Sequence, residues 1–173
     1  MKVLEDFVQL IGGPLRSVAD ARLELLARRW DVVFPPDMVQ ILTAYGDSIV
    51  AGELTLFGPG TLERMSSYRE GGLFPLGLDD ANPRLVFPQP GGLLQWGMGS
   101  AGDIFSLRLD GQGDWVVSTY DQLAFEWIDY DLGFSDWLYS ALSGESEFDI
   151  LPPLGEKWPL SIIPLDLEKF LRW

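Results

Sequence analysis

The stretch FPPDMVQILTAYGD, residues 34 to 47, combines a helix start, an apolar face and a helix stop. Pro36 and Asp37 are residue types that favour the first turn of a helix. Apolar side chains recur at helical spacing at Met38, Ile41, Leu42 and Tyr45. Gly46 is suited to ending the helix, and GELTLFG, residues 52 to 58, then alternates as a short strand does. The stretch predicts a helix followed by a strand.

The same periodicities predict further elements on both sides of this stretch. Helices are expected at residues 3 to 11, 17 to 30 and 134 to 143, with a short one from Asp166. Strands are expected at residues 85 to 87, 93 to 96, 104 to 109, 115 to 119 and 123 to 128. Residues 58 to 84 are rich in Gly, Pro and Asp, which predicts an irregular connection with a helical turn near residues 62 to 68.

The order of these elements indicates the fold class and the domain organisation. Helices, then a run of strands, then helices are typical of an α+β protein. A chain of 173 residues is the size of one domain. We therefore expect a single domain over residues 1–173, with N-terminal helices in 2–30, a core at about 30–144 and a Pro-rich C-terminal extension at 150–173.

The residue types that are missing exclude much of enzyme chemistry. The chain has no Cys and no His, so it lacks the thiolate and imidazole that serve as common nucleophiles, bases and metal ligands. Catalysis by paired carboxylates and oxygen-only Mg²⁺ or Ca²⁺ binding are left. We predict a non-enzymatic protein with no cofactor and no metal site.

Glu5 and Asp6 do not fit a secretory leader, and without cysteines or a long apolar run we expect a cytoplasmic protein away from membranes.

Two short motifs resemble ligand-binding sequences but lack the context they need. GMGSAG, residues 97 to 102, matches G-x-G-x-x-G, yet a strand pattern follows where a dinucleotide site requires a helix. Asp129 and Asp131 could begin a calcium loop, but that loop would need Gly and Glu at later positions where this chain has Phe134 and Ser140. We interpret the first motif as a loop between strands and the second as a turn.

Acidic residues are concentrated in one segment. Residues 109 to 156 hold 11 Asp and Glu and no Lys or Arg, within a chain of net charge −14. Such a surface repels nucleic acid and attracts a basic protein partner, although acidity also serves solubility alone. The candidate partner-binding residues are Asp110, Asp114, Trp115, Asp121, Glu126, Asp129 and Asp131.

Several motifs together resemble the SUKH superfamily, the Smi/Knr-type proteins. The resemblance rests on FPPDMVQILTAYGD followed by GELTLFG, on Trp96-Gly97, Gly102-Asp103 and Trp115-Val116, and on GFSDWLYSALSG. It implies an α+β domain with a mostly antiparallel central sheet flanked by helices. Many bacterial members are immunity proteins that neutralise toxins, often nucleases, and others are cytoplasmic binding domains.

The combined expectation is a cytoplasmic immunity protein that neutralises a basic, nuclease-type toxin domain through its acidic surface. A scaffold or regulatory domain of the same fold is one alternative, and an enzyme that uses carboxylates or a bound metal is another. The sequence predicts no particular oligomeric state.

Overall fold

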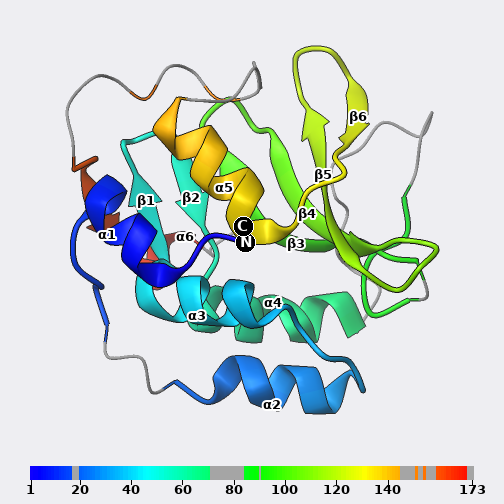
Figure 1. Ribbon diagram of the computed structural model, residues 1–173. Helices are drawn as coiled ribbons and strands as arrows, with labels where there is room; N and C mark the ends of the chain where they lie inside the picture. The colour runs from blue at the N-terminus through cyan, green and yellow to red at the C-terminus, as the bar shows by residue number, and fades with distance from the viewer. Residues whose placement is uncertain are drawn as a thin grey trace.

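A computed structural model describes residues 1–16, 20–70, 84–89 and 91–144, together with Leu151, Leu154 and 159–170. Within these residues the chain forms one seven-stranded sheet in the order β6-β5-β4-β3-β2-β1-β7, with helices packed around it (Figure 1). Every pair of neighbouring strands is antiparallel. The predicted α+β class with its antiparallel central sheet is confirmed. No helix in the described part of the chain is long and apolar enough to cross a membrane.

The helices follow the predicted pattern except at the start of α2 and over the length of α4. They are α1 (Leu4–Ile11), α2 (Arg22–Arg29), α3 (Pro36–Tyr45), α4 (Pro59–Glu70), α5 (Phe134–Ser143) and α6 (Leu167–Phe170). The predictions for α1, α3 and α5 are confirmed. Helix α2 begins at Arg22, later than predicted, and the suggested cap Ser17 lies outside the described residues. Helix α4 extends over twelve residues where only one turn was predicted.

The strands are β1 (Ser48–Val50), β2 (Leu54–Leu56), β3 (Leu94–Gly99), β4 (Ile104–Leu109), β5 (Trp115–Asp121), β6 (Glu126–Asp129) and β7 (Ile162–Pro164). The predicted β4–β5 hairpin is confirmed. Two three-residue strands, β1 and β7, were not predicted, and they pair with each other. The C-terminal extension therefore adds a strand to the sheet. Strand β6 begins at Glu126, so the prediction of a strand from residue 123 was wrong for its first three residues.

Four buried aromatic side chains hold α5 against the sheet. The Trp96 ring of β3 stacks on Phe105 of β4 at 5.6 Å between centroids. Phe134 and Trp137 of α5 meet the same ring edge-on at 4.9 and 5.7 Å. Edge-to-face contacts are favourable for aromatic pairs at these separations. The predicted apolar stripe of α5 therefore packs in the core.

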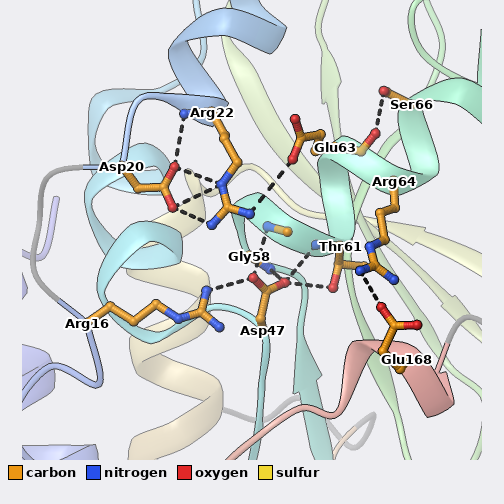
Figure 2. Close-up of polar contacts among 11 residues, drawn as sticks. Arg16, Asp20, Arg22, Asp47, Gly58, Thr61, Glu63, Arg64, Ser66 and Glu168 are labelled. Carbon is orange, nitrogen blue, oxygen red and sulfur yellow. Dashed lines mark hydrogen bonds and ion pairs between the residues drawn. The ribbon is translucent and has the colours of Figure 1, made fainter.

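The Asp47 carboxylate is fully buried and caps the start of α4 (Figure 2). It accepts hydrogen bonds from the backbone N–H groups of Gly58, Gly60 and Thr61 at 2.8 to 3.0 Å, and from the Thr61 hydroxyl at 2.7 Å. Arg16 completes the set with an ion pair of 2.7 Å. The backbone N–H groups of Gly58, Gly60 and Thr61 are donors that the first turn of a helix leaves without internal partners. One side chain thus fixes where α4 begins.

The pKa of Asp47 is the balance of two opposing effects. Burial acts to raise the pKa, but the hydrogen bonds from Arg16, Thr61 and Gly60 outweigh it and hold the pKa below its usual value. A lowered pKa in the folded state stabilises the fold at every pH above the unfolded value of about 3.9. That contribution is lost only as the pH falls through the lower folded-state pKa.

We expect Asp47→Ala to lower the free energy of unfolding by at least about 3 kcal/mol, because it leaves several buried donors unpaired. Asp47→Asn should cost less, since its one remaining oxygen still accepts hydrogen bonds. Urea denaturation followed by circular dichroism at neutral pH measures both. The exposed Asp131→Ala is the control and should change stability by less than about 0.5 kcal/mol. Equal stability of Asp47→Ala and the native protein would contradict this role.

Candidate functional site

The structure divides the seven predicted partner-binding residues among separate places on β5 and β6. Asp110, Asp114 and Trp115 lie at the start of β5, in and beside its turn from β4. Asp121 lies at the other end, where it pairs with Glu126 of β6. A seven-residue strand spans about 20 Å, so these two groups form two surfaces rather than one.

At the start of β5 two of the three predicted residues, Asp110 and Trp115, serve the fold. The Asp110 carboxylate accepts the backbone N–H groups of Asp114 and Gln112 at 2.9 and 2.8 Å, and these bonds lower its pKa. The Trp115 indole donates to the Val33 carbonyl at 2.9 Å, and its ring packs near Phe34. Asp110 therefore shapes the turn, and Trp115 holds the segment between α2 and α3. A groove of about 430 Å³ lies beside this segment.

Asp129 lies between two arginines. Its carboxylate pairs with Arg84 at 2.9 Å and with Arg108 at 3.3 Å, and it accepts the Ser118 hydroxyl at 2.6 Å. Burial acts to raise the pKa of Asp129, but Ser118 and Arg84 outweigh it and lower that pKa. Because its charge is already paired, Asp129 contributes less to a negative surface than the sequence suggested. Both arginines lie outside residues 109 to 156 in the sequence, and the sheet brings them in.

The turn between β5 and β6 exposes two large apolar side chains. The Asp121 carboxylate accepts the N–H groups of Leu123 and Ala124 at 2.7 and 2.8 Å. These bonds reverse the chain, and the hairpin projects at the top of Figure 1. Leu123 is 80% exposed and Phe125 is 64% exposed. We call residues 121 to 126 the β5–β6 tip. The predicted strand was wrong here because the side chain of Asp121 forms the turn.

Two further acidic residues lie in other turns at the same end of the sheet as the β5–β6 tip. Asp103, in the β3–β4 turn, is 5% exposed and accepts the Gln122 N–H at 3.1 Å. Burial raises the pKa of Asp103, and the charge of Asp121 raises it further. In the neighbouring β1–β2 turn, Glu53 accepts a hydrogen bond from Ser100. Among the described residues, no Lys or Arg forms an ion pair with Asp103, Asp121 or Glu126.

Asp131 is exposed and follows β6, the last strand of the described sheet. The neighbouring Tyr130 N–H donates to the Val117 carbonyl, which places Asp131 toward the start of β5 and away from the tip. Sequence reasoning missed Leu123 and Phe125 as parts of a surface, and it missed Asp103 as a buried acid behind that surface. A signal for the turn was present, because an Asp often accepts the N–H two residues later and turns the chain.

The two short ligand-like motifs lie at the β3–β4 turn and at the end of β6. The glycine motif covers the end of β3 and the turn into β4, so a strand follows it, as predicted. Within the described ranges no group of three or more Asp or Glu could hold a metal ion.

A scan against protein-family models finds no match to this chain. Searches of curated proteins and of solved structures also find no match.

Replacing Asp103 with Asn should raise the free energy of unfolding at neutral pH. The pKa of Asp103 is raised in the fold, so its ionised form destabilises the native state relative to the unfolded chain. As the pH falls toward the unfolded value of about 3.9, the native state binds this proton first and the penalty disappears. Urea denaturation of both proteins at neutral pH and at about pH 4 tests this. A gain that is equal at both pH values, or no gain, would contradict it.

Proposed function

We propose that this protein is a non-enzymatic binding protein of the cytoplasm, an immunity protein that neutralises a basic, nuclease-type toxin through its acidic surface. The observation behind this proposal is the β5–β6 tip with its neighbours. There Asp121 and Glu126 lie side by side with no cation paired to them in the described residues. Nuclease domains are basic because they bind phosphate, so a negative surface both attracts and covers them.

The fold is compatible with this role. The α+β class with an antiparallel sheet is what the SUKH resemblance implies. The tip lies beside β6, which is an edge strand of the sheet that the described residues form. Its turn is fixed by the hydrogen bonds of Asp121, which lowers the entropy that binding would cost.

The test uses the product of the open reading frame adjacent to the gene of this protein. That product should inhibit growth when produced alone, and co-production of this protein should restore growth. The purified pair should associate more slowly as salt concentration rises, because salt screens the attraction between the charged surfaces. Growth assays and surface plasmon resonance measure these effects. Binding without restored growth would favour the scaffold or regulatory alternative.

Glu126→Lys should slow association about tenfold at low salt, because it reverses one charge on the surface that attracts the partner. Glu24→Lys is the matched control: it makes the same change in net charge on the exposed face of α2, far along the chain from the tip. Stopped-flow or plasmon-resonance association rates measure both. Equal rates for the native protein and Glu126→Lys, together with no salt dependence, would contradict the proposal.

A further inference from the structure

The β5–β6 tip differs from the other places where apolar side chains are exposed. Single exposed apolar residues are common on protein surfaces. Here two large ones, Leu123 and Phe125, occupy one short turn two residues apart, and both are more than half exposed. Both residues lie between β5 and β6 in the chain, and the turn that joins these strands projects from the molecule (Figure 1).

The backbone at Phe125 makes this exposure harder to explain by packing. Phe125 has φ of +57°, in the left-handed region that Gly and Asn adopt more readily than a bulky side chain. With 64% of its surface exposed, the Phe125 ring gains little from burial to offset that conformation. Strained residues of this kind concentrate at functional sites.

We propose that Phe125, with Leu123 beside it, is the hydrophobic anchor that enters an apolar pocket rimmed by Lys or Arg on the toxin. This inference rests on the proposed function and names the contact that would supply its affinity. Aromatic side chains at the centre of an interface supply much of the binding energy, whereas charges at its rim mainly set association rates. Asp121 and Glu126 lie on either side of the anchor in the chain, and their negative charges would attract Lys or Arg at the rim of the toxin's pocket.

A protein partner fits this surface better than a membrane. An exposed Phe and Leu at a hairpin end could also enter a lipid bilayer, but cytoplasmic membrane surfaces are negatively charged. Asp121 and Glu126 would then be repelled at the point of insertion. Vesicles that contain anionic lipid should therefore not bind this protein in a flotation assay, and binding to them would overturn the assignment of a protein partner.

The variant Phe125→Asn tests whether Phe125 contributes to binding affinity without contributing to the stability of the fold. Asn tolerates the left-handed conformation, so the Tm of the variant should equal or exceed that of the native protein. Its Kd for the toxin, the product of the adjacent reading frame, should rise about thirty-fold or more, as expected for an interface anchor. Val33→Asn is the matched control, because Val33 is 82% exposed and lies between α2 and α3, near the opposite end of β5. It should change neither quantity.

The outcomes distinguish failure of the anchor from failure of the proposed function. If Phe125→Asn binds as tightly as the native protein while Glu126→Lys still slows association, the anchor role is overturned and the proposed function stands. If the native protein does not bind the toxin, the proposed function fails and the anchor fails with it. A Tm lowered by more than about 5 °C, a loss above 1 kcal/mol for a domain of this size, would make Phe125 a structural residue. Leu123→Ser should weaken binding as well, and a Kd unchanged in both variants would overturn the inference.

Discussion

The buried carboxylate of Asp47 is the interaction on which most of this fold depends. It lies where α3 ends and β1 begins, and it caps α4 through three backbone N–H groups. Its own backbone carbonyl accepts the N–H of Leu165, which joins the C-terminal segment to the same point. Gly46 and Gly58 lie so close that a Cβ on either would come within 2.8 Å of the other's backbone. This close approach brings the carboxylate within reach of α4.

The parts of the fold that were predictable are those that local sequence determines. Helices α1, α3 and α5 have an apolar face and a glycine at the end, and the β4–β5 hairpin has its turn residues. Helix α4 was missed because its start is fixed by a carboxylate more than ten residues earlier in the chain. Strands β1 and β7 are three residues long, too short to show alternation, and their pairing joins residues that are more than a hundred positions apart.

The sequence predicted the negative charge of the candidate site, but it did not predict which side chains form the exposed surface. Counting acids found the base-free segment, yet Asp129 is paired with two arginines that lie outside it. In Asp110 and in Asp121 one carboxylate oxygen, Oδ1, accepts two turn N–H groups, which is a structural role that net charge does not reveal. The exposed position of Phe125 depends on the turn formed by Asp121. The alternating pattern of residues 123 to 128 predicted a strand, so the exposed turn that holds Phe125 was not predicted.

The residues that stabilise the fold and the proposed binding surface lie apart in the sheet. The Asp47 cluster lies beside β1, and the β5–β6 tip adjoins β6, with four strands between them in the sheet. A change at an exposed tip loses few packing contacts, so the fold tolerates different side chains there. Acidic residues along β6 also discourage its pairing with another sheet edge, which gives them a use without any partner. Protection of the edge explains the acidic residues on β6, but it does not explain an exposed Phe in the turn. Phe125 is therefore the residue that best distinguishes a binding surface from an edge strand that is only protected against pairing.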